Sequence, residues 1–153
     1  MNKEELQKAV SYALRFLSYR PRSEFEVRSR LRRKFVIEVI DLTVENLKSQ
    51  GLLDDIAFAA AWTRSRISYR PRSASMVSRE LFQKGVSGDV ARDAVKDIDD
   101  DESAYVAGQK ILLRGIQEEY GNYRRKMWGY LQRRGFNATV ISRVIRRLWE
   151  EKC

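Results

Sequence analysis

The sequence predicts an all-α fold, in which three tandem three-helix, helix-turn-helix-like repeats stack into an elongated, curved array. First, the hexapeptide Ser-Tyr-Arg-Pro-Arg-Ser at positions 18–23 returns unchanged at positions 68–73. Second, a step of fifty residues aligns Leu31 with Leu81 and Leu131. Third, apolar residues recur at helical spacings of three and four, and we find no sustained alternation typical of strands. Because units of about fifty residues bury little surface alone, we expect them to share interfaces.

The first repeat, residues 1–50, is expected to begin with a helix over about 4–18. Its inward stripe comprises Leu6, Ala9, Val10, Ala13, Leu14 and Leu17. Pro21 disfavours helical geometry at Arg20, and Ser23 with Glu26 three residues later forms a capping box that starts a second helix. That helix directs Val27 and Leu31 inward. A third helix carries Ile40, Val44 and Leu47, and ends at Gly51 in a left-handed conformation.

The second and third repeats, residues 51–101 and 102–153, are expected to follow the same plan. Asp54 and Ser87 are predicted to cap helices. The buried side of the helix after Asp54 is assigned to Phe58, Ala61, Trp62 and Ser65, and that of the helix after Ser87 to Ala91, Val95 and Ile98. Between them, Val77 and Leu81 face inward before Gly85. The corresponding inward residues of the third repeat are Met127, Leu131, Ile141, Ile145 and Leu148, with Gly135 between its helices.

Positive charge is concentrated in the first and third repeats. The chain has 30 Lys and Arg against 21 Asp and Glu, a formal charge of +9. Residues 1–50 hold 11 basic and 7 acidic residues, 51–101 hold 8 and 9, and 102–153 hold 11 and 5. This distribution favours a polyanion or an acidic protein surface as partner.

The composition argues against an enzyme. The chain has no histidine and a single cysteine, Cys153, so histidine general bases and thiolate metal sites are not expected. No glycine-rich nucleotide loop occurs either. We expect no cofactor and no metal. No apolar run approaches the roughly 18 residues of a membrane span, and the N-terminus lacks a signal-peptide pattern. A cytoplasmic protein, without membrane contact and monomeric, is therefore expected.

Several motifs, in order along the chain, resemble the RecX regulatory proteins. They are Arg-Pro-Arg-Ser at 20–23, Leu31 to Lys34, Gly-Leu-Leu-Asp-Asp at 51–55 followed by Phe58, Ala59 and Trp62, and a second Arg-Pro-Arg-Ser at 70–73 before Lys84 and Gly85. The resemblance runs from about residue 5 to 150. It implies an all-helical modulator of the RecA recombinase, active in DNA repair, homologous recombination and the SOS response. Members of the family bind the RecA filament on single-stranded DNA, lodge in its helical groove, and damp its ATP hydrolysis, strand exchange and co-protease activity.

The chain departs from this pattern at two places. Lys34 is followed by Phe35 where Lys-Gly is expected, so we expect the first repeat to build that turn differently. In the third repeat, Asn-Tyr-Arg-Arg at 122–125 replaces the Arg-Pro-Arg-Ser motif, which leaves the start of the following helix undetermined.

The candidate binding residues are cations of all three repeats. We expect the first and third repeats to bind the partner through arginine side chains. The candidates are Arg20, Arg22, Arg28, Arg32, Arg33 and Lys34 in the first repeat, Arg70 and Arg72 in the second, and Arg124, Arg125, Lys126, Arg133 and Arg134 in the third. Glu24 and Glu26 stand four residues before Arg28 and Arg30, so solvated intrahelical pairs are an equally simple interpretation. Arg22 and Arg72 either stabilise the turn after proline or contact the partner directly.

The aromatic residues near these cations also allow two interpretations. Tyr19 and Tyr69 are expected to pack between repeats rather than stack on bases. Trp128 lies beside the inward column and is either a core edge or an exposed anchor, while Trp149 is expected to be partly buried. The alternative to a recombinase regulator is a DNA- or RNA-binding protein that acts alone, although no helix rich in Asn, Gln and Arg, of the kind that reads base edges, is evident.

Overall fold

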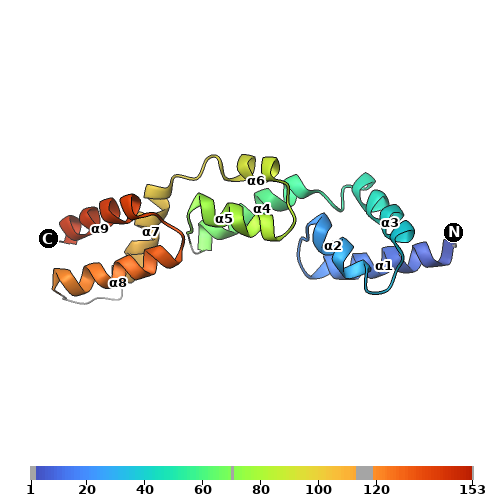
Figure 1. Cartoon of the computed structure of the whole chain (residues 1–153), viewed down its shortest axis with the longest axis horizontal. Coiled ribbons are helices and arrows are strands. Elements are labelled where there is room, and N and C mark those ends of the chain that lie inside the picture. The colour runs from blue at the N-terminus through green and yellow to red at the C-terminus, as the bar shows by residue number, and fades with distance from the viewer. Residues whose placement is uncertain (1–2, 70, 113–118, 153) are drawn as a thin grey trace. The chain divides into compact units, whose positions relative to one another are not determined.

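The computed structural model describes residues 3–69, 71–112 and 119–152 of the 153-residue chain. Within these ranges every regular element of secondary structure is a helix, which confirms the all-α prediction (Figure 1). The nine described helices are α1 (Lys3–Tyr19), α2 (Glu24–Leu31), α3 (Ile37–Ser49), α4 (Asp55–Tyr69), α5 (Ala74–Gln83), α6 (Gly88–Val95), α7 (Asp100–Leu112), α8 (Tyr120–Arg133) and α9 (Ala138–Lys152). Among these helices, none combines the length and hydropathy that a membrane crossing requires.

The chain forms two compact units, which are described separately. The first unit comprises residues 1–61 with 81–91, and the second comprises residues 62–80 with 92–153. In the first unit α1, α2 and α3 pack on one another, and in the second unit α7, α8 and α9 do so.

The first core lies between α1, α2 and α3. Its buried residues are Ala9, Ala13, Val27, Leu31, Val39, Ile40, Val44, Leu47 and Leu53. Small side chains at positions 9 and 13 let α1 approach α3 closely, and Tyr12, Phe16, Leu17 and Phe35 cover the edge of the core. The stripe predicted for α1 is wrong at Leu14, which is 41% exposed, because the helix turns Tyr12 and Phe16 towards its neighbours instead.

The other core lies between α7, α8 and α9. Its buried residues are Ala104, Ala107, Tyr123, Met127, Leu131, Phe136, Val140, Ile141, Val144, Ile145 and Leu148. All five apolar residues predicted to face inward in the third repeat are among them. Trp128 and Trp149 are half-buried against this core, so the prediction of a partly buried Trp149 is confirmed.

The helix ends predicted at Ser23, Gly51, Asp54 and Ser87 are confirmed. Ser23 and Glu26 form a complete capping box at the start of α2. The Asp54 carboxylate accepts hydrogen bonds from the N–H groups of Ile56 and Ala57, at 2.9 and 3.2 Å, and the Ser87 hydroxyl accepts one from the N–H of Val90 at 3.3 Å. Gly51 ends α3 with a φ of 72°.

Two assignments of buried residues in the middle of the chain are wrong. In α4 the buried positions are Phe58, Ala59 and Thr63, whereas Ser65 is exposed. The inward stripe therefore follows a different spacing from the one that we predicted. Ile98 lies beyond the end of α6 at Val95, so it does not belong to that helix.

The turn after the second helix of each repeat is built in two ways. In the later repeats, Gly85 and Gly135 adopt φ values of 79° and 91°, and the next N–H donates to the carbonyl of Leu81 or Leu131 five residues earlier. In the first repeat, Phe35 itself donates to Leu31 four residues earlier, and no non-glycine residue described has a positive φ. The first turn is thus one residue shorter, which confirms that it is built differently.

Within each unit, the start of one repeat's second helix docks on the end of the next repeat's second helix. In the first unit the Ser23 hydroxyl donates to the carbonyl of Lys84 at 2.5 Å. In the second unit the N–H of Ser73, the equivalent serine, donates to the carbonyl of Arg134 at 3.1 Å. We call these contacts the first and second interlocks.

A carboxylate from the first residue of a later helix, α4 or α7, completes each interlock. Asp55 accepts a hydrogen bond from the N–H of Glu24 at 2.8 Å, and Asp100 accepts one from the N–H of Ala74 at 2.9 Å. Burial raises the pKa of Asp55, although the Glu24 N–H partly opposes this effect. Each carboxylate therefore satisfies a backbone donor in the first turn of a helix, which would otherwise lack an acceptor.

Candidate interaction surfaces

The first Arg-Pro-Arg-Ser motif folds back onto the half-buried carboxylate of Glu26. Arg20 donates to Glu26 at 2.5 Å and to the carbonyl of Pro21 at 2.8 Å. Arg22 places its guanidinium 4.0 Å from the centroid of the Phe16 ring and 3.9 Å from Glu26. Burial, reinforced by the charge of Arg20, lowers the pKa of Arg22. Both arginines are thus held within the turn, as the structural interpretation of this motif requires.

Glu26 connects the turn to the first interlock. Lys84 lies 3.6 Å from its carboxylate, and the N–H of Ser23 donates to it at 3.1 Å. Burial acts to raise the pKa of Glu26, but hydrogen bonds from Arg20 and Ser23 outweigh burial and hold the pKa below its usual range. The predicted pair with Arg30 is not among the ion pairs of Glu26, because the guanidinium of Arg30 lies against the rings of Phe16 and Tyr12.

The second Arg-Pro-Arg-Ser motif uses another carboxylate in the same way. Glu80 of α5 accepts hydrogen bonds from Arg72, from Arg66 at 3.1 Å and from the indole N–H of Trp62 at 3.1 Å. Arg72 therefore stabilises the middle repeat. Arg70 and the side chain of Tyr69 lie outside the described residues. Tyr19 is 77% exposed, so our prediction that it packs between repeats is wrong.

Arg28 is also neutralised within the first repeat. Its guanidinium contacts Glu24 at 3.0 Å and Asp41 of α3 at 2.7 Å. Hydrogen bonding to Asp41, followed by that to Glu24, raises the pKa of Arg28 against the opposing effect of burial. Because Glu24 also contacts Lys48 at 3.0 Å, this network joins α2 to α3 and leaves little charge for a partner.

Three consecutive cations at the end of α2 remain exposed, and we call them the α2 patch: Arg32, Arg33 and Lys34. Arg32 and Arg33 make no ion pair with any described residue, and Lys34 places its ammonium 4.9 Å from the centroid of the Tyr12 ring. Val36 and Ile37 continue this surface and are 61% and 53% exposed. The patch therefore combines unneutralised positive charge with apolar side chains that could pack on a partner.

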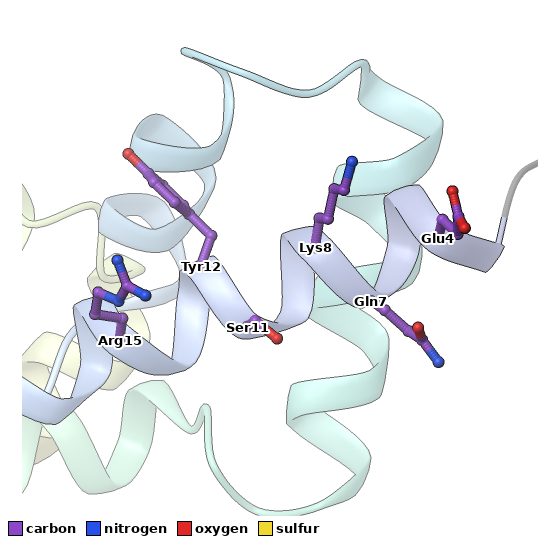
Figure 2. A pocket seen from close by; sticks show the side chains of 6 residues that line it. All are labelled: Glu4, Gln7, Lys8, Ser11, Tyr12 and Arg15. Atoms are coloured by element: carbon purple, nitrogen blue, oxygen red, sulfur yellow. The ribbon is translucent and has the colours of Figure 1, made fainter.

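Tyr12 links the α2 patch to a groove along α1. The groove encloses about 520 Å³ and is lined by Glu4, Gln7, Lys8, Ser11, Tyr12 and Arg15, all from one helix (Figure 2). Our sequence analysis did not select Tyr12, Lys8 or Arg15. The only available signal was their spacing of three and four, which places them together on a helix face that the apolar stripe does not use.

In the third repeat, α8 carries its cations without acidic neighbours on the same helix. Residues 120–133 contain Arg124, Arg125, Lys126 and Arg133 but no Asp or Glu. All four are exposed, and Arg124, Arg125 and Arg133 form no ion pair within the described parts of the chain. Arg134 instead lies with its guanidinium 3.8 Å from the centroid of the Tyr130 ring.

Two cations of α9 behave differently from those of α8. Arg143 pairs with Asp101 at 3.0 Å and Arg147 pairs with Glu151 at 3.1 Å. Neighbouring exposed arginines without an ion pair to a described residue are found in the α2 patch of the first unit and on α8 of the second unit.

Comparisons with known proteins give one consistent result. Sequence models of the first, second and third three-helix domains of RecX match residues 9–47, 54–95 and 99–145. The regulatory protein RecX of Prosthecochloris aestuarii is 33% identical over 97% of this chain and 98% of its own length. RecX of Oceanobacillus iheyensis is 33% identical over 95% of this chain, which spans 55% of that longer protein. The crystal structure of RecX from Lactobacillus salivarius superposes with a TM-score of 0.81 over 96% of this chain and 98% of that chain, at 24% identity.

Proposed function

Because the chain belongs to the RecX family of regulatory proteins, we propose that it binds the RecA recombinase filament on single-stranded DNA and inhibits its activities. The inhibited activities are ATP hydrolysis, strand exchange and the co-protease reaction of the SOS response. The single observation that carries this proposal is the presence of all three family domains, in order, along the chain. The protein would act where the recombinase meets DNA, in the cytoplasm, and as a monomer.

The α2 patch supports this proposal as the contact with an acidic surface of the recombinase. Arg20, Arg22 and Arg28 are already paired with carboxylates of the first unit, whereas Arg32 and Arg33 pair with no carboxylate among the described residues. An unpaired guanidinium gains a full charge-assisted hydrogen bond when it meets a partner carboxylate, while a paired one must first lose its own. We therefore narrow the predicted binding residues of the first repeat to the three cations of the α2 patch.

The test is ATP hydrolysis by the cognate RecA on single-stranded DNA while this protein is titrated. We expect the wild-type protein to suppress hydrolysis, and the double variant Arg32→Glu with Arg33→Glu to need about tenfold more protein for half-inhibition. The matched control is Arg64→Glu with Arg79→Glu, which reverses two exposed charges on α4 and α5. Equal inhibition by the α2 variant and the control would remove the α2 patch from the interface. Undiminished hydrolysis with excess wild-type protein would refute the proposed function itself.

The absence of acidic residues from α8 favours a second candidate function, an autonomous DNA- or RNA-binding protein. That function predicts tight binding to bare nucleic acid, with an affinity that falls steeply as salt rises. Fluorescence anisotropy on the same oligonucleotide without recombinase distinguishes the two candidates. A fall in hydrolysis at concentrations that leave bare DNA unbound supports the filament regulator.

A further inference from the structure

One face of α8 forms an open groove around Trp128. The groove encloses about 430 Å³ and is lined by Gly121, Arg124, Arg125, Trp128 and Gly129. These positions are separated by three, four, seven and eight residues from position 121, so they lie on one side of the helix. We call this surface the α8 groove.

Two glycines keep the α8 groove open. Outside the backbone of α8 itself, no heavy atom of a described residue lies within 4 Å of the position that a Cβ would occupy at Gly121, and at Gly129 the nearest is the Nη1 atom of Arg133 at 3.2 Å. Glycine is unfavourable in the middle of a helix, by about 1 kcal/mol relative to alanine, so local helix propensity does not explain Gly129. Their effect is to let a ligand approach the indole ring of Trp128 past bare backbone.

The indole ring of Trp128 is partly exposed to solvent. Trp128 is only half-buried, with one edge against the core of the third repeat, and the guanidinium of Arg124 lies 4.9 Å from its ring centroid. Arg125 is exposed, and its Nη2 atom donates to Asn122 at 3.0 Å. The groove thus combines an aromatic ring packed on the core with two arginines that form no ion pair with any described carboxylate.

We propose that the α8 groove binds single-stranded DNA by stacking one base on Trp128, while Arg124 and Arg125 contact the flanking phosphates. The combination of aromatic platform and unneutralised arginines is the one that single strands require, because every base has a π-face and every nucleotide a negative charge. The inference rests on the proposed function, in which the protein meets such a strand inside the recombinase filament, and it assigns the strand to α8 and the recombinase to the α2 patch.

An acidic peptide fits the α8 groove less well than a nucleotide. Its carboxylates would satisfy the arginines, but they offer no flat ring to the indole and no reason for the glycines on either side. Duplex DNA fits less well too, because its bases are already stacked and paired. All the charged residues of α8 are also basic, which suits a phosphate backbone better than isolated carboxylates.

The direct measurement is the fluorescence of Trp128 in a full-length variant in which Trp62→Phe and Trp149→Phe leave it as the only tryptophan. Circular dichroism first establishes that this variant keeps the helicity of the wild type. Titration with a fifteen-residue oligothymidylate should quench the emission, since stacking brings the base onto the ring. An abasic oligonucleotide of the same length should bind more weakly and leave the emission largely unchanged.

Affinity measurements on bare DNA provide the second readout. Trp128→Leu should weaken binding of oligothymidylate by roughly tenfold, the loss expected from one stacked base. Because Trp128 touches the core, Gly121→Leu serves as an independent variant that fills the groove without changing charge or burying a side chain. It should weaken binding to a similar extent. Arg64→Gln, which removes an exposed positive charge on α4, is the control and should change the affinity by less than about twofold.

Three results would overturn the inference. The first is that oligothymidylate does not quench the fluorescence of Trp128, and the second is that the abasic strand binds as tightly as oligothymidylate. The third is that a polyglutamate peptide displaces the DNA and quenches the fluorescence equally well. The last result would assign the groove to an acidic protein. None of these experiments contains recombinase, so they can fail while inhibition of RecA stands, and inhibition can fail while they succeed.

Discussion

At the scale of single residues, the glycines after the second helices meet two separate requirements. Both Gly85 and Gly135 have a positive φ, which other residues adopt at a cost. In addition, a Cβ at Gly85 would lie 2.1 Å from the Cβ of Phe25, and one at Gly135 would lie 2.5 Å from the hydroxyl of Ser73. The glycines therefore give the turn its shape and also give the preceding repeat room to dock.

Gly51 meets only the first of these requirements. It has a φ of 72°, but no described atom lies within 4 Å of the position that a Cβ would occupy. We expect Gly51→Ala to lower the free energy of unfolding by about 1–2 kcal/mol, the cost of a left-handed alanine. Gly85→Ala should cost the same amount and a further 1–3 kcal/mol or so, because the Phe25 side chain and the first interlock must shift. Urea unfolding followed by circular dichroism measures both. Equal losses for the two variants would mean that the contact with Phe25 contributes nothing.

At the scale of helices, α3 begins without the cap that its counterparts have. The hydroxyl of Ser87 caps α6, and the side chain of Asn137 accepts from the N–H of Val140 at 2.9 Å at the start of α9. Val36 holds the equivalent place before α3 in extended geometry but has no side-chain hydrogen bond. The shorter turn at Phe35 explains the difference, because it moves a valine into the position where the other repeats have a polar residue.

Val36→Thr should therefore stabilise the protein. Threonine has nearly the shape of valine, and the position is 61% exposed, so the substitution adds a hydroxyl acceptor without removing a buried contact. We expect a gain of about 0.5–1 kcal/mol in the free energy of unfolding, measured by urea denaturation. Val36→Ala, which cannot cap, is the control and should give no gain. A threonine variant no more stable than the alanine variant would show that the first turn of α3 does not need this acceptor.

Most of the helices could be predicted from the sequence because their signals are local. The capping box of Ser23 with Glu26, the caps at Asp54 and Ser87, and the left-handed Gly51 all act within four residues. What could not be predicted depends on residues far apart in the chain. The hydroxyl of Ser23 meets a carbonyl 61 residues later, and no spacing rule indicates that contact.

The candidate site was predicted less well than the fold for the same reason. In the densest cluster of arginines in the sequence, Arg20, Arg22 and Arg28 are paired with carboxylates. One of these carboxylates, Asp41 of α3, lies on another helix. The sequence gives the number of charged residues but does not show which of them form ion pairs in the folded protein. Trp128 could not be assigned to core or surface either, because its half-buried position depends on how α8 packs against α9.

At the scale of the whole molecule, the two proposed binding surfaces belong to different units. The α2 patch lies in the unit of residues 1–61 and 81–91, and the α8 groove lies in the unit of residues 62–80 and 92–153. Neither surface shares a residue or an ion pair with the other among the described residues. Their contributions to binding should therefore be independent, as is usual for sites without common partners.

Independence predicts a separation of functions between the two surfaces. Arg32→Glu with Arg33→Glu should raise the protein concentration needed to inhibit RecA but change affinity for bare oligothymidylate little, whereas Gly121→Leu should weaken both. In the combined variant, the two losses in filament affinity, expressed as free energies, should add to within about 0.5 kcal/mol. Titrations of ATP hydrolysis and of anisotropy on all four proteins measure this. A combined loss no larger than either single loss would mean that the two surfaces do not engage the filament together, and an equal effect of the α2 variant on bare DNA would place the strand on both.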